Sequence, residues 1–185
     1  ERVPIFNIKI VWSIFNLLFI CLYQMGLIFL FSLPILAAWQ GEGSAINVYD
    51  IIIAILMLSF IITESVADKQ QFEFQFNKYK KIDNNETLTG DFKRGFISKG
   101  LWSISRHPNF ISEQLIWVTF YLFSISATGI YLNWSIIGCV LLIILFYNSA
   151  NYTESISEKK YSDYKQYKKK VSMFLGVKKM NWEEN

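Results

Sequence analysis

The residues best suited to chemistry form one short run in the middle of the chain, Ser105-Arg106-His107-Pro108-Asn109. Proline suits the first turn of a helix, where no backbone donor is needed, and we expect Ser105 or His107 to cap that helix. The free N–H groups and the dipole of a helix start attract anions, and the Arg106 guanidinium adds a charge and a fork of donors. The run therefore predicts a site for a phosphate or a carboxylate. Contact with a lipid headgroup is the alternative interpretation.

Carboxylates and amides lie near this run at helical spacing. Asn109, Glu113 and Trp117 are four residues apart and share one helix face. Glu64 and Asp68 are spaced in the same way. A third group, later in the chain, contains Asn148, Asn151, Tyr152 and Glu154. Because ionisable groups at the edge of apolar segments are costly and usually functional, the three groups together predict a pocket with a polar mouth and an apolar floor. Helix capping and surface anchoring are the alternative.

Four apolar segments must position these residues. Of the 185 residues, 52% are hydrophobic and 18% are charged, whereas a soluble domain carries about 25% charge. A membrane-spanning helix needs about 20 mostly apolar residues. Segments near this length lie at 11–36, 48–66, 110–125 and 131–147, and short connections join them as two hairpins. The sequence therefore predicts an all-α, multi-pass transmembrane bundle of about four spans with additional interfacial helices.

The basic residues give this bundle a direction. All 18 Lys and Arg precede the first span, lie between the second and third, or follow the fourth. Positive charge marks the side that is not translocated, so the basic face is predicted to be cytoplasmic or its equivalent. The endoplasmic reticulum and the mitochondrial inner membrane both agree with this pattern. Segments 70–79 and 159–170 are amphipathic or basic and are expected at the membrane surface, where lipids are the expected partners and nucleic acid is not.

Two cysteines and one histidine restrict the remaining chemistry. Cys21 and Cys139 both lie within apolar segments and are expected to be free and buried. With one histidine in the chain, a multi-histidine metal centre is excluded. No metal site is expected.

The motif also resembles a known family. The run GLWSISRHPNF at residues 100–110, followed by Glu113, resembles the signature of steroid 5-alpha-reductase-like membrane proteins, and most closely their large uncharacterised branch. Two further blocks agree, at residues 64–71 and 153–174, so that the resemblance covers residues 48–176 in order. It divides the chain into an N-terminal membrane helix and turn (1–47), a reductase-like membrane domain (48–176) and a C-terminal end (177–185).

The resemblance implies a cofactor and a site. Reductases of this superfamily bind NADPH from the cytoplasmic side and transfer its hydride to an activated C=C bond. By motif, the implied cofactor site consists of Glu64, Asp68, Arg106, His107, Asn109, Glu113, Tyr161 and Tyr164. Asn109 and Glu113 would hold the nicotinamide, with the carboxylates of residues 64 and 68 in the same pocket. Arg106 and His107 would serve the phosphates or the pocket wall, and a tyrosine would close it.

The function is therefore predicted as a membrane-embedded, NADPH-dependent reductase in lipid metabolism, acting on a lipid or sterol-like enone. The residues that activate the substrate carbonyl in such reductases come largely from N-terminal helices and have no assigned counterpart here, so the catalytic residues are not predicted. One alternative is an S-adenosylmethionine-dependent methyltransferase, because isoprenylcysteine and phospholipid methyltransferases share an Arg-His-Pro element that opens a membrane helix. Another is an accessory subunit of a larger membrane complex.

Overall fold

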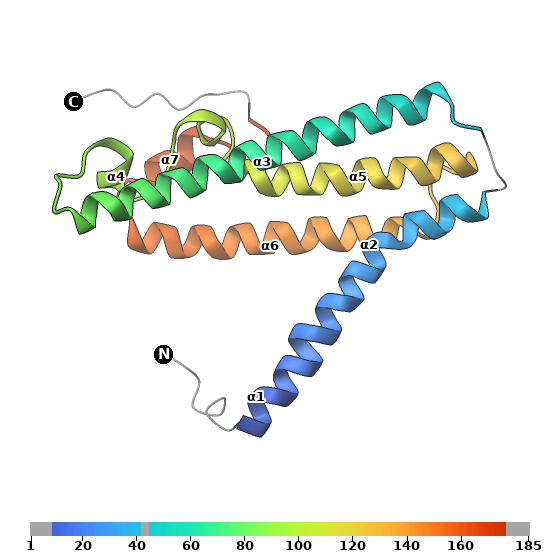
Figure 1. Ribbon diagram of the computed structural model, residues 1–185, viewed down its shortest axis with the longest axis horizontal. Coiled ribbons are helices and arrows are strands. Elements are labelled where there is room, and N and C mark those ends of the chain that lie inside the picture. Colours follow the sequence, from blue (N-terminus) through green and yellow to red (C-terminus); the bar gives the residue numbers. More distant parts are fainter. Residues whose placement is uncertain (1–8, 42–44, 177–185) are drawn as a thin grey trace.

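The computed structural model describes residues 9–41 and 45–176, and within these ranges it is a bundle of helices (Figure 1). The elements are α1 (Lys9–Phe15), the π-helical η2 (Asn16–Leu22), α2 (Tyr23–Gln40), α3 (Val48–Asp83), α4 (Gly90–Arg94), the 3-10 helix η3 (Gly100–Ser103), α5 (Pro108–Thr128), α6 (Ile136–Lys160) and α7 (Tyr164–Lys170). The described residues contain one isolated β-bridge, between Ser105 and Ser172, and no strand. The all-α prediction is confirmed.

Four helical stretches are long and apolar enough to cross a membrane, which confirms the predicted multi-pass bundle. They are Lys9–Gln40, Val48–Asp83, Pro108–Thr128 and Ile136–Lys160. The first three predicted segments lie within them, whereas the fourth, predicted at 131–147, begins only at Ile136, and α3 and α6 continue further into polar sequence. Both continue because their polar ends contain no Gly or Pro, so backbone hydrogen bonding persists beyond the lipid.

The end of α3 shows how an amphipathic sequence is accommodated. Segment 70–79 continues the same helix as the second span. Phe72, Phe76 and Tyr79 are exposed on one side. Phe74, on the other side, is buried and stacks on Phe92 with ring centroids 5.4 Å apart. This extension carries polar side chains beyond the span and toward the loop that follows it.

Helix α5 lies at the centre of the packing. It runs beside α3 and also contacts α2 and α6, while α2 contacts α6 (Figure 1). Gly138 lets α6 approach the backbone of α2 closely, because a Cβ there would collide with the carbonyl group of Leu30. Small residues at such crossings are typical of membrane helices. By contrast, α1 and η2 extend away from the bundle with exposed apolar side chains.

The C-terminal segment, residues 161–176, returns to the start of α5. The Arg106 N–H donates to the Ser172 carbonyl at 2.9 Å, and the His107 N–H donates to the Met173 carbonyl at 3.1 Å. Three side chains of this segment, Tyr164, Tyr167 and Val171, form a buried cluster with Phe96. The motif that opens α5 is therefore covered by residues about 65 positions later in the chain.

Candidate functional site

Glu154 is a fully buried carboxylate that contacts the motif at residues 105–109. It is carried by α6, and its side chain has no exposed surface. Its carboxylate accepts hydrogen bonds from Arg106 Nε at 2.7 Å and Arg106 Nη2 at 3.2 Å. His107 Nε2 and Lys168 Nζ each lie 3.1 Å from the same carboxylate. Three basic side chains thus surround one carboxylate, as a buried charge requires.

The remaining donors of Arg106 bind the C-terminal segment. Its Nη1 atom donates to the Lys168 carbonyl at 3.0 Å and also to the Val171 carbonyl. The guanidinium therefore joins α6 to the segment that follows it. The Arg106 donors, which were predicted to bind a phosphate or a ligand carboxylate, therefore bind Glu154 and two backbone carbonyls of the protein itself.

The start of α5 differs from the predicted cap. Pro108 occupies the first turn, as its chemistry favours, and His107 is at the N-cap position, but no side chain caps the helix. Instead, the Ser105 hydroxyl donates to the Met173 carbonyl at 3.0 Å and accepts from the His107 N–H at 3.2 Å. The prediction of a Ser105 or His107 cap is wrong because the C-terminal segment and Glu154 bind both side chains.

A second group of polar residues lies between α3 and α5, and we call it the carboxylate cluster. It consists of Glu64, Asp68, Asn109 and Glu113. The Asn109 amide donates to Asp68 Oδ1 at 3.0 Å. Glu113 accepts from Trp117 Nε1 at 2.8 Å and lies within hydrogen-bonding reach of the Glu64 carboxyl group. Two of the three polar groups expected to converge are thus in contact.

From the third group, Glu154 alone points inward. Asn151 and Tyr152 are exposed on α6, and the Asn151 amide donates to the Tyr147 carbonyl in its own helix at 3.0 Å. The predicted site residues therefore form two neighbouring arrangements, one around Glu154 and one in the carboxylate cluster.

A cavity of about 320 Å³, which we call the tyrosine cavity, lies beside both arrangements. Its lining includes five of the eight predicted residues, namely Arg106, His107, Asn109, Tyr161 and Tyr164. Asn109 belongs to both the lining and the carboxylate cluster. The remaining lining residues are Gln71, Gln75, Gly95, Phe96, Ile97, Trp102, Phe110, Thr153, Ser157 and Tyr167. The cavity thus has an aromatic floor and polar walls from α3 and α6.

The polar walls were missed by the sequence analysis. Gln71 and Gln75 are one helical turn apart on α3, and Thr153 and Ser157 are one turn apart on α6. Part of the signal was present, since Gln71, Thr153 and Ser157 fall inside the blocks that resemble the reductase family, at residues 64–71 and 153–174. Gln71 Oε1 is buried and has no hydrogen-bond partner among the described residues. An unpaired buried acceptor in a cavity wall is suited to a ligand that donates a hydrogen bond.

The tyrosines close the cavity from the C-terminal side. Tyr164 and Tyr167 are buried, and burial raises the pKa of both phenols far above the usual range. The Tyr167 hydroxyl donates to the Trp102 carbonyl. The ammonium groups of Lys78 and Lys160 lie 5.5 and 5.3 Å from the centre of the Tyr161 ring. Two positive charges therefore lie beside the Tyr161 ring at the edge of the cavity, and the Lys78 ammonium also donates to the Gly95 carbonyl at 3.0 Å.

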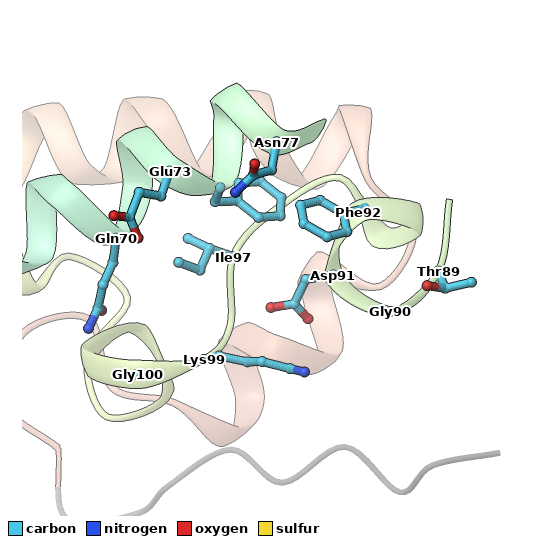
Figure 2. A pocket seen from close by; sticks show the side chains of 11 residues that line it. Gln70, Glu73, Asn77, Thr89, Gly90, Asp91, Phe92, Ile97, Lys99 and Gly100 are labelled. Carbon is cyan, nitrogen blue, oxygen red and sulfur yellow. The ribbon is translucent and has the colours of Figure 1, made fainter. Parts of the chain in front are cut away.

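A second cavity, the loop cavity, lies between the end of α3 and the loop that contains α4 (Figure 2). It measures about 420 Å³ and contains none of the predicted site residues. Glu73 and Asn77 line it from α3, and Asp91 and Lys99 line it from the loop (Figure 2). The Asp91 carboxylate accepts from Ser98 N and Ser98 Oγ, both at 2.8 Å, and from Arg94 at 3.0 Å. By binding Arg94 and Ser98, this carboxylate holds the loop at residues 91–98 in its conformation.

Within residues 9–41 and 45–176, no group of three His, Cys, Asp or Glu side chains is placed to hold a metal ion.

Comparison with known proteins places these features in a family. The model of a protein family of unknown function, DUF1295, matches residues 5–171 and so includes the first helix as well as the motif. "Uncharacterized protein C594.04c" of Schizosaccharomyces pombe is 33% identical over 175 residues, which are 90% of this chain and 51% of the relative. The chain thus spans about half the length of the curated relative it matches. No solved structure matches significantly.

Proposed function

Because the chain belongs to the DUF1295 family, which includes steroid 5-alpha-reductase-like proteins, we propose that it is a membrane-embedded, NADPH-dependent reductase acting on a lipid or sterol-like enone. One observation carries the proposal. Asn109 is shared between the carboxylate cluster and the lining of the tyrosine cavity. A ligand in the cavity would therefore meet an oriented amide with carboxylates behind it, at the start of a membrane span.

The cavity residues fit one end of this cofactor. A nicotinamide carboxamide can donate to the unpaired Gln71 Oε1 atom and can also bond the Asn109 side chain. The cavity, at about 320 Å³, is at the lower end of ligand pockets and would hold one end of a dinucleotide. Lys78 and Lys160, beside Tyr161, would hold the phosphates. NADPH supplies the hydride when bound.

The protein residues would orient the ligand and exclude water. Asp68 fixes the Asn109 amide by the hydrogen bond between them, and Trp117 fixes the Glu113 carboxylate. Tyr164 and Tyr167 place neutral rings over the cavity, because burial favours the uncharged phenol. Glu154 holds the segment that carries these rings by binding Arg106 and Lys168. We propose that this side faces the cytoplasm, in either the endoplasmic reticulum or the mitochondrial inner membrane.

NADPH titration tests the proposal. The full chain in lipid nanodiscs should quench or shift the fluorescence of the reduced nicotinamide in a saturable manner. Asn109→Ala should weaken this binding about five- to thirtyfold, since it removes a hydrogen bond to a polar ligand group worth about 1–2 kcal/mol. Asn151→Ala is the matched control, because Asn151 is exposed and bonds only within α6 among the described contacts. It should bind as the wild type does.

An exchange of two side chains sharpens the test. Asn109→Asp alone places two carboxylates in contact, whereas the double variant Asp68→Asn/Asn109→Asp restores an amide–carboxylate pair. We expect the double variant to bind NADPH more tightly than Asn109→Asp does. Absence of NADPH binding to the folded wild type would refute the reductase proposal, and saturable S-adenosylmethionine binding in its place would favour the methyltransferase.

A second candidate, an accessory subunit of a membrane complex, is favoured by α1 and η2. Among the described residues, α1 makes its main helix contact with η2, and its large side chains Ile10, Trp12 and Ile14 are exposed. A stoichiometric partner that copurifies and crosslinks to this helix, together with failure to bind either cofactor, would support this function. Crosslinks to lipid alone would exclude it.

A further inference from the structure

The outer face of the C-terminal segment is densely basic. Tyr164 and Tyr167 point into the protein and are buried. Lys165, Lys169 and Lys170 lie on the opposite side of α7 and are exposed. The short helix is therefore divided into an aromatic face over the tyrosine cavity and a lysine face turned away from it.

The described part of the chain does not pair these three lysines with carboxylates. Lys168, their neighbour, pairs with both Glu154 and Glu158. Within the described residues, no carboxylate lies within ion-pair distance of the ammonium groups of Lys165, Lys169 or Lys170. The lysine face therefore carries three positive charges that attract an external anion.

The depth of this face follows from backbone hydrogen bonds. Residues 172 and 173 accept hydrogen bonds from the backbone of Arg106 and His107. The next residue in the chain, Pro108, begins α5, which is long and apolar enough to cross a membrane. Since two residues span at most about 7 Å, Lys170 lies close to the level at which α5 enters the membrane. Leu175, which follows, is 77% exposed. Lysines followed by an exposed apolar side chain are typical of a membrane surface.

We infer that the lysine face docks on the phosphate-bearing headgroups of anionic phospholipids in the leaflet on this side, with Leu175 at the edge of the hydrocarbon. Docking presses the aromatic face of α7 onto the tyrosine cavity, so the charge of the leaflet controls access to it. Near an anionic surface each lysine changes the binding equilibrium by about fivefold, and three lysines change it by about a hundredfold. The inference does not depend on which ligand enters the cavity.

Hydrogen–deuterium exchange of the full chain in nanodiscs tests this inference. Nanodiscs of phosphatidylcholine alone are compared with nanodiscs that also contain phosphatidylserine, and the readout is amide protection in residues 161–173. The variant Lys165→Gln/Lys169→Gln/Lys170→Gln removes the lysine face. The control Lys80→Gln/Lys93→Gln/Lys99→Gln removes the same charge from exposed lysines elsewhere. Lys80 is 32 residues along α3, or about 48 Å, and so lies beyond the lipid core of about 30 Å.

We expect phosphatidylserine to raise protection at least tenfold in the wild type and in the control. The lysine-face variant should exchange equally in both lipids, and added salt should reduce the wild-type response. Equal wild-type exchange in both lipids would overturn the inference, as would a full response in the lysine-face variant. Equal protection by inorganic phosphate in phosphatidylcholine nanodiscs would also overturn it, because the face would then be a site for free anions.

Discussion

The Arg106 guanidinium and the Glu154 carboxylate face each other in the protein interior, with the Nε–Oε1 and Nη2–Oε2 distances at 2.7 and 3.2 Å. The two residues are 48 positions apart, and their pairing connects the start of α5 to the end of α6. Because Arg106 also binds two carbonyls of the C-terminal segment, this pair determines where Tyr164 and Tyr167 lie. The geometry of the candidate site depends on it.

Glu154→Gln is expected to destabilise the protein by about 3 kcal/mol. The substitution leaves the buried Arg106 charge without its counter-ion, and breaking a buried pair on one side typically costs about 3–5 kcal/mol. Unfolding in detergent with increasing temperature or denaturant measures the change. Glu158→Gln is the control, because Glu158 bonds the partly exposed Lys168 and should contribute less than about 1 kcal/mol. Equal losses in both variants would contradict a structural role for Glu154.

Gly138→Ala is expected to separate α2 from α6 and to lower stability by about 1–3 kcal/mol. The added Cβ would meet the Leu30 carbonyl, and overpacking of this kind forces the backbone to shift. Gly26→Ala is the matched control in α2, since a Cβ there meets nothing within 4 Å and alanine favours the helix. Melting temperatures in one detergent compare the two. A Gly138→Ala variant as stable as Gly26→Ala would show that the helices are further apart.

Asp91→Ala is expected to loosen the loop that lines the loop cavity. The substitution leaves the buried Ser98 N–H without its acceptor, at a cost of about 1–3 kcal/mol. Amide exchange in residues 89–99 should accelerate, while exchange in α5 and α6 should not change. Glu86→Gln, an exposed acid near the same loop, serves as the control. If amide exchange in residues 89–99 does not change, Asp91 does not stabilise the loop.

Alkaline pH is expected to weaken the fold partly through Tyr164. Burial raises the pKa of Tyr164 above its value of about 10 in the unfolded chain. Below pH 10 both states bind the proton and this contribution to stability is complete. Above pH 10 the unfolded chain releases the proton first, so the free energy of unfolding falls as pH rises toward the folded pKa. Tyr164→Phe should make this decline less steep, and Tyr131→Phe, at an exposed position, should not. Parallel slopes for all three proteins would contradict the prediction.

The sequence by itself determined the class of fold. The length and purity of the apolar segments required four helices able to span a membrane, and the grouping of lysines and arginines predicts that the bundle has one basic side. Pro108 marked the start of α5, and the spacing of Asn109 and Glu113 placed both on one helix face. These features are local, because helix geometry and hydropathy depend on residues within a few turns of one another.

Only the tertiary structure decided which polar groups meet. From the sequence, Arg106 is predicted to bind an external anion. In the structure its guanidinium binds Glu154 and the carbonyls of the C-terminal segment. The Asn109–Asp68 bond joins residues 41 positions apart, and the unpaired Gln71 oxygen depends on what α5 and α6 leave uncovered. A hydrogen-bond partner is chosen by packing between distant helices. Residue types and spacing indicate which groups a side chain can bind. They do not indicate which of those groups the fold places beside it.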